Sequence, residues 1–221
     1  MALPRRQAAR HGNVTAGISI MSTPASVERF DVSEFLQREA QEHRAVVEAT
    51  MQDLPQPFAQ TLDIWEKAIR RGGKLLLFGN GGSAADAQHI AAELVIRYKS
   101  NRSAIAAIAL TTDSSTLTAC ANDFGYETIF SRQIEALAAA GDVAVGISTS
   151  GSSPNVLAGL REARKRKVTT TGLTGGDGGS MRDLCDALVI VPSRTTARIQ
   201  EGHIMIGHML CKALEIRLEL V

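Results

Sequence analysis

The feature that most constrains the fold is a unit that recurs from Gly72 onward: an apolar run, a loop of small residues and a helical segment. The apolar runs cover residues 74–78, 105–110, 143–148, 168–173 and 187–191. They are apolar throughout rather than alternating, which is typical of strands that carry helices on both faces. Right-handed crossovers between parallel strands then give a doubly wound sheet. The pattern predicts an α/β three-layer sandwich, with ligands beyond the carboxyl ends of the strands.

Helical segments flank this repeat. Apolar residues recur at helical spacing over residues 35–51, and Pro55 and Pro57 are expected to end that helix before a second one at about 58–71. A long amphipathic helix at about 197–218 closes the chain. Residues 1–30 are interpreted as a disordered tail, or as a mis-started one if Met21 is the true start. Residues 31–221 then form a single domain, including the N-terminal helices.

Charge and cysteine content exclude several classes of protein. Lys plus Arg number 24 against 23 Asp plus Glu, so the net charge of +1 favours neither nucleic acid nor a membrane surface. No apolar run approaches the roughly 18 residues that cross a bilayer. Cys120, Cys185 and Cys211 are widely spaced and form no CxxC pair, which argues against disulfides or a thiolate zinc site. We therefore expect a cytoplasmic protein with three small buried cysteines.

The segment 148–153 is rich in hydroxyl groups and directly precedes a helix that Pro154 can open. Backbone N–H groups and the positive end of the helix dipole favour a phosphate at such a place. A simple helix N-cap explains the same residues equally well. The loop 79–83 lacks the third glycine of a dinucleotide fingerprint and no Walker lysine motif is present, so no nucleotide cofactor is expected.

His89, Glu93 and Arg97 follow one another at four-residue spacing in the helix after Ser83, and so share one face. An imidazole and a carboxylate at this spacing can share a metal ion, while Arg97 can hold Glu93 or a substrate oxygen. A surface ladder of salt bridges fits the isolated spacing as well. Small residues at five neighbouring positions indicate a packed helix, which favours the metal interpretation.

The last helix contains Gln200, His203 and His208. Spacing alone pairs Gln200 with His203, because His208 lies about 12 Å further along the helix axis. Helical rotamers direct the His208 side chain back toward the N-terminus, so both side chains can still lean together. Periodicity therefore leaves open which histidine belongs to a metal site.

Four stretches together carry a family pattern. They are residues 79–89 (GNGGSAADAQH), residues 122–127 (NDFGYE), residues 148–151 (STSG) with Ser153, and residues 198–201 (RIQE) followed by His208. The chain resembles the sugar isomerase domain family and, within it, the sedoheptulose 7-phosphate isomerases of bacterial heptose biosynthesis. The resemblance runs from about Gln37 to the C-terminus.

The resemblance implies a five-stranded flavodoxin-like sandwich and a homotetramer with sites at subunit interfaces. It places the ligands of a divalent metal, usually zinc, on His89, Glu93, Gln200 and His208. It places substrate contacts on Glu93, Gln200 and a set of loop residues, namely Asn80, Gly81, Gly82, Asn122, Asp123, Ser148, Thr149, Ser150 and Ser153. The implied reaction converts D-sedoheptulose 7-phosphate to D-glycero-D-manno-heptose 7-phosphate.

The chemistry of such a reaction suits these residues. Moving a carbonyl between C1 and C2 through an enediol needs proton transfer, which Glu93 and His208 can supply as the catalytic pair. A metal can stabilise the oxyanion. The alternative is a non-enzymatic regulator of the same fold that binds the replication initiator protein. That group is expected to lack the residues equivalent to Glu93 and His208, both of which are present here.

Overall fold

The computed structural model describes residues 30–221. The predictions of a disordered tail and of a start at Met21 concern residues outside this range, apart from residue 30 itself. Five parallel strands form one sheet in the order β2-β1-β3-β4-β5. The strands are β1 Leu75–Gly79, β2 Ala107–Ala109, β3 Val143–Ser148, β4 Thr169–Gly175 and β5 Ala187–Val191. This order confirms the predicted flavodoxin-like sheet.

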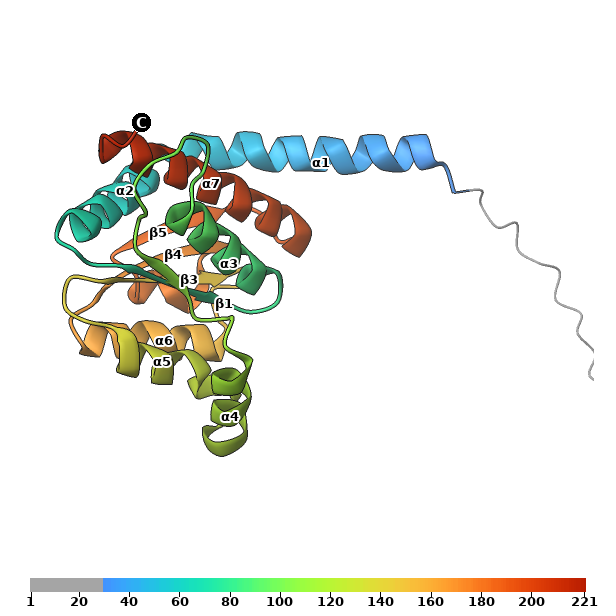
Figure 1. Ribbon diagram of the computed structural model, residues 1–221. Coiled ribbons are helices and arrows are strands. Elements are labelled where there is room, and N and C mark those ends of the chain that lie inside the picture. Colours follow the sequence, from blue (N-terminus) through green and yellow to red (C-terminus); the bar gives the residue numbers. More distant parts are fainter. Residues whose placement is uncertain (1–29) are drawn as a thin grey trace, which may run out of the picture.

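Seven α-helices accompany the sheet within the described range. They are α1 Val32–Asp53, α2 Pro55–Arg70, α3 Gly82–Val95, α4 Ser114–Phe124, α5 Ile129–Leu137, α6 Pro154–Lys165 and α7 Thr196–Arg217. Helices α2, α3 and α7 cover one face of the sheet, and α5 and α6 cover the other (Figure 1). The three-layer sandwich is therefore confirmed. Helix α1 runs past the layers and projects beyond them (Figure 1).

The effect of Pro55 between the first two helices differs from the prediction. Pro55 opens α2 rather than only ending α1, so the second helix begins three residues before the expected position at 58. Proline suits the first helical turn because its missing N–H group would have no intrahelical partner there. Asp31 caps α1 by accepting hydrogen bonds from the backbone N–H groups of Ser33 and Glu34 at 2.8 and 3.1 Å.

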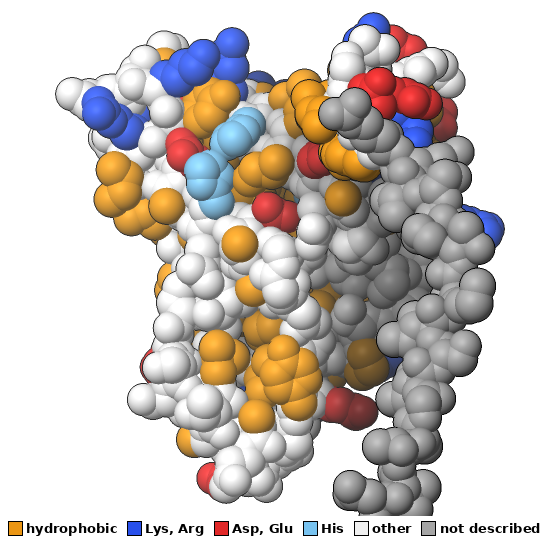
Figure 2. All heavy atoms as spheres, turned by 90° about the vertical axis from the view of Figure 1, so that its right-hand side faces the viewer, with side chains coloured by type: hydrophobic (Ala, Val, Ile, Leu, Met, Phe, Trp, Pro, Cys, Tyr) orange, Lys and Arg blue, Asp and Glu red, His pale blue; other side chains and the backbone are white. Residues whose placement is uncertain are grey.

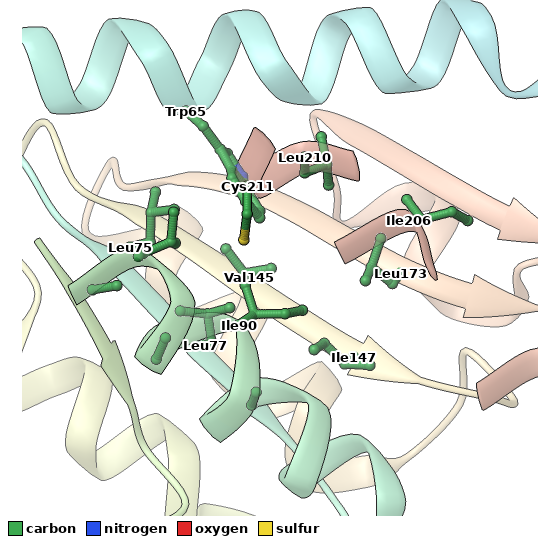
Figure 3. Close-up of a cluster of buried hydrophobic side chains, with 14 of the residues drawn as sticks. Trp65, Leu75, Leu77, Ile90, Val145, Ile147, Leu173, Ile206, Leu210 and Cys211 are labelled. Atoms are coloured by element: carbon green, nitrogen blue, oxygen red, sulfur yellow. The ribbon is translucent and has the colours of Figure 1, made fainter. Parts of the chain in front are cut away.

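The core between the sheet and helices α2, α3 and α7 fixes their positions. Figure 3 shows Trp65 of α2 and Ile206, Leu210 and Cys211 of α7 packed over the central strands. The Trp65 indole is fully buried and donates a hydrogen bond to the Thr171 hydroxyl at 3.1 Å. Such burial supplies most of the folding free energy, at about 25 cal/mol per Å² of apolar surface.

The edge of the sheet is shorter and more open than the apolar pattern predicts. Only residues 107–109 of the expected strand 105–110 pair with β1, and the Ile108 side chain is 40% exposed.

Of the three cysteines, Cys120 and Cys211 are buried as expected, whereas Cys185 is only partly buried. No helix among residues 30–221 is both long and apolar enough to cross a membrane.

Candidate active site

The site forms where α3 and α7 pack side by side on the same face of the sheet. Gly207 makes the close approach possible, because a Cβ atom at this position would lie only 2.7 Å from Cδ1 of Ile90. At the start of α3, a Cβ atom on Gly82 would collide with the side-chain amide of Gln200. The two helices thus face each other over several turns, and residues far apart in the sequence meet across the seam.

Three of the predicted metal ligands converge at this seam. The Nε2 atoms of His89 on α3 and His208 on α7 lie 2.8 Å apart, although 119 positions separate them in the chain. An oxygen of Glu93 lies 3.5 Å from His89 Nε2. One potential ligand atom from each side chain falls within 4.8 Å of the other two. Two imidazoles and a carboxylate so placed form a possible metal-binding group.

The metal-binding group of His89, Glu93 and His208 is open to solvent. The His89 side chain is 47% exposed and that of Glu93 is 21% exposed. Histidine side chains lie at the surface beside a carboxylate on the face shown in Figure 2, with hydrophobic side chains around them. Tyr98 borders the group, since its ring centroid lies 5.6 Å from that of His208. A small molecule can therefore reach these three side chains from one side.

Gln200 meets the start of α3. Its amide packs against Gly82, which precedes His89 by two turns, or about 10 Å along α3. Gln200 and the three converging side chains thus lie along the same seam between α3 and α7, and its role as a metal ligand stays a prediction.

The two histidines of α7, between which periodicity leaves the choice open, differ in their packing. His208 joins His89, whereas His203 is 0% exposed and lies inside the core. Burial lowers the pKa of His203 to about 4, and the neighbouring Thr174 backbone opposes this shift only in part. His203 is therefore a neutral core residue, and its burial favours His208 over His203 for the proposed metal site.

Two expectations about α3 are wrong. Arg97 does not continue the ladder, because α3 ends at Val95 and the Arg97 guanidinium donates to Asn101 Oδ1 at 2.7 Å. The alanines do not all pack inside, since Ala85 and Ala92 are exposed. Helical spacing predicts a shared face only as far as the helix continues, and Ile96 already follows its last turn.

Asp86 lies one turn before His89 on α3. Burial raises the pKa of Asp86 to about 6, and the charge of His89 opposes this shift. Its Oδ2 atom is buried without a hydrogen-bond partner among the described residues. An aspartate in this state holds its proton more tightly than usual. Near pH 6, Asp86 therefore carries less negative charge beside the metal-binding group than an exposed aspartate would.

The loop 148–153 has the compact form expected of an anion cradle. The Ser148 hydroxyl contacts those of Ser153 at 2.9 Å and Ser150 at 3.4 Å. Gly151 adopts a φ of +63°, and a Cβ atom there would collide with the carbonyl of Gly178. Pro154 opens α6, and the Ser153 side chain makes no capping bond at this end. The N-cap explanation is therefore weaker than the cradle.

Side-chain hydrogen bonds join Asn80, in the loop after β1, to Asn155 in the first turn of α6 and to Tyr126 after α4. Asn80 and Asn155 exchange two amide hydrogen bonds of 2.8 Å, and the Tyr126 hydroxyl donates to Asn80 Oδ1 at 3.0 Å. Asn155 is only 2% exposed. The predicted set includes Asn80 but omits Asn155 and Tyr126. Tyr126 lies within the family stretch 122–127, and Asn155 follows Ser153 by two residues, so proximity to these motifs is the sequence signal for both.

Other predicted contacts lie at the end of α4 and in the loop 148–153. Asn122 and Asp123 are exposed at the end of α4, where the Asn122 amide donates to Asp123 Oδ1 at 2.8 Å. A hollow of about 580 Å³ opens beside Thr149 and Ser150 and reaches Ile199 at the start of α7. Within the described range, no side chain of the metal-binding group lines this hollow. The hollow therefore adjoins the hydroxyl loop rather than the metal-binding group.

Comparison with known proteins shows to which family the chain belongs. The family model of the SIS domain matches residues 40–175. A phosphoheptose isomerase of Paramagnetospirillum magneticum is 59% identical over 181 residues, which are 82% of this chain and 94% of that protein. The solved phosphoheptose isomerase of Neisseria gonorrhoeae is 40% identical with a TM-score of 0.79, covering 84% of this chain and all of that one.

A second solved structure agrees. The phosphoheptose isomerase of Francisella tularensis is 33% identical with a TM-score of 0.81, and the match covers 85% of this chain and 100% of that one. The chain belongs to the SIS domain family and, within it, to the phosphoheptose isomerases.

Proposed function

We propose that this isomerase converts D-sedoheptulose 7-phosphate to D-glycero-D-manno-heptose 7-phosphate with the help of a divalent metal ion. The observation that carries the proposal is the convergence of His89, Glu93 and His208 from two helices at the surface. Relatives that match nearly their whole length are named phosphoheptose isomerases, which supports the substrate class. Membership of an enzyme family weighs against the non-enzymatic alternative.

Zinc fits the donor set. Zinc binds imidazole nitrogen and carboxylate oxygen at about 2.0–2.2 Å in tetrahedral sites, so neighbouring ligand atoms lie about 3.3 Å apart. The distances of 2.8 Å between His89 and His208 and of 3.5 Å between His89 and Glu93 bracket this value. Gln200 would supply a fourth ligand. When bound, the ion would act as a Lewis acid toward the substrate oxygens.

Glu93 and His208 would move the protons. Isomerisation removes one proton from C1 while the C2 oxygen gains one, which gives an enediol. The C1 hydroxyl then loses its proton as C2 gains one, so atoms and electrons balance. These steps need groups that exchange protons with carbon and with oxygen on the same side of the sugar. Glu93 and His208 flank His89 and can serve both positions.

The hydroxyl loop would hold the phosphate. Ser148, Thr149, Ser150 and Ser153 surround the N-terminus of α6, where the helix dipole favours an anion. Binding energy at this remote phosphate would fix the sugar over the reacting groups. Asn80, which hydrogen-bonds to Asn155 of α6, would contact the substrate together with Gly81 and Gly82 at the start of α3. Asn122 and Asp123 of α4 would contact the sugar hydroxyls.

The active form would be a homotetramer with sites at subunit interfaces. The start of α1 presents apolar side chains to solvent, with Phe30, Val32 and Leu36 exposed by 68, 59 and 59%. Isolated exposed apolar residues are common, but a projecting helix with such a stripe favours association with another subunit. Neighbouring subunits would also shield the open side of the metal-binding group.

Incubation of the purified protein with sedoheptulose 7-phosphate tests the proposal. NMR should detect the aldose product when the protein carries zinc, and treatment with a chelator should abolish turnover until zinc is restored. Absence of aldose from zinc-loaded protein would overturn the substrate assignment. Full activity after complete removal of metal would overturn the metal-assisted mechanism while leaving the isomerase assignment intact.

A further inference from the structure

A buried ion pair lies behind the metal-binding group. Arg102 and Glu215 are 113 positions apart, and the Arg102 Nε atom donates to Glu215 Oε1 at 2.7 Å. Their side chains are only 1 and 3% exposed. A buried ion pair contributes little net stability, because removing both charges from water costs about as much as their attraction returns. Its presence is better explained by the position that it imposes on its surroundings.

Arg102 caps the end of α3 that carries Glu93. Its guanidinium donates to the backbone carbonyls of Glu93 at 2.7 Å and Leu94 at 2.6 Å. These carbonyls belong to the last turn of α3, where helix carbonyls lack intrahelical partners and a cation is favoured. One planar guanidinium therefore contacts the backbone of a proposed metal ligand and, at the same time, a carboxylate on α7.

Glu215 completes the connection on the other helix. It follows His208 by seven residues, which is two helical turns, so both side chains lie on the same side of α7. The same Oε1 atom accepts a hydrogen bond from the Tyr98 backbone N–H group at 3.2 Å. Tyr98 in turn packs against the His208 ring, with centroids 5.6 Å apart. Glu215 is thus connected to His208 through Tyr98 and α7, and Arg102 is connected to Glu93 through the last turn of α3.

We propose that Arg102 and Glu215 are positioning residues that hold α3 and α7 at the spacing required for His89, Glu93 and His208 to bind one metal ion. The inference rests on the proposed metal site. The pair touches neither substrate nor metal, and acts through the last turn of α3, the Tyr98 backbone and α7. Its loss should weaken metal binding by more than the loss of a comparable buried ion pair elsewhere in the chain.

The chain offers such a control pair. Lys74 Nζ lies 2.6 Å from Asp142 Oδ2, and the two side chains are 25 and 3% exposed, so the Asp142 carboxylate is as buried as that of Glu215. Asp142 also accepts hydrogen bonds from the backbone N–H groups of Lys74 and Ala139 at 2.9 and 2.8 Å. This pair lies at the amino ends of β1 and β3, and none of its hydrogen bonds reaches α3 or α7. A purely structural role would give both pairs the same effects.

The experiment measures zinc affinity by competition with a chelator, and stability by urea denaturation of the metal-free proteins. Wild type, Glu215→Gln and Asp142→Asn are compared as full-length assembled protein. We expect Glu215→Gln to lower zinc affinity at least tenfold and Asp142→Asn to change it less than twofold, although both lower stability. Equal affinities of Glu215→Gln and wild type would overturn the proposal.

The double variant Arg102→Met/Glu215→Leu guards against a failure of Glu215→Gln to fold. An apolar pair of similar volume often restores the stability of a buried ion pair. We expect this variant to fold with zinc affinity at least tenfold below wild type, and affinity within twofold of wild type would overturn the proposal. If wild type itself binds no zinc, the proposed metal site fails and the positioning role fails with it, which is a separate and recognisable result.

Discussion

At the scale of single residues, His203 and His208 occupy opposite environments on one helix. His208 meets His89 at the surface, whereas His203 is fully buried. We expect His208→Asn to leave the protein folded, to lower turnover at least about a hundredfold, as for a lost acid or base, and to reduce zinc content. His203→Asn should lower stability but retain zinc. Metal analysis and NMR assays of both variants check this, and the reverse pattern of zinc loss would contradict the site.

The burial of His203 also predicts a dependence of stability on pH. Its pKa is about 4 in the folded protein and about 6.5 when exposed, so the unfolded chain gains the proton first as the pH falls. The free energy of unfolding should therefore decrease between pH 6.5 and 4, with about 3 kcal/mol from this residue. Urea denaturation of metal-free protein across this range measures the decrease. A variant without the imidazole, such as His203→Asn, should show a smaller one.

At the scale of an element, the hydroxyl loop can be separated from the metal-binding group. Replacing Ser150 and Ser153 with Ala should weaken binding of the sugar phosphate at least tenfold, because each hydroxyl is a proposed phosphate donor near the N-terminus of α6. Zinc affinity should remain within about twofold, a difference of about 0.4 kcal/mol. Calorimetry measures both, and Ser152→Ala in the same loop is the control. Unchanged sugar phosphate affinity would place the phosphate elsewhere.

At the scale of the whole molecule, the exposed apolar residues of α1 predict an interface. Leu36→Glu should convert the proposed tetramer to smaller species, because a buried unpaired carboxylate is costly at an interface. Gln37→Glu adds the same charge at the neighbouring exposed position and should leave the assembly intact. Light scattering after size-exclusion chromatography distinguishes them. A tetramer that persists in Leu36→Glu would show that this part of α1 lies outside the interface.

The sequence by itself determined the layers of the fold and most of the candidate site. Strand positions followed from apolar runs, and the loops at their carboxyl ends followed from small and hydroxyl-bearing residues, because these signals are local. The burial of His203, the contact of His208 with His89, the end of α3 before Arg97 and the partnership of Arg102 with Glu215 were decided only by the tertiary structure. Each depends on how closely α3 packs against α7, and helical periodicity within one segment carries no information about the rotation or spacing of a second helix that lies a hundred residues away.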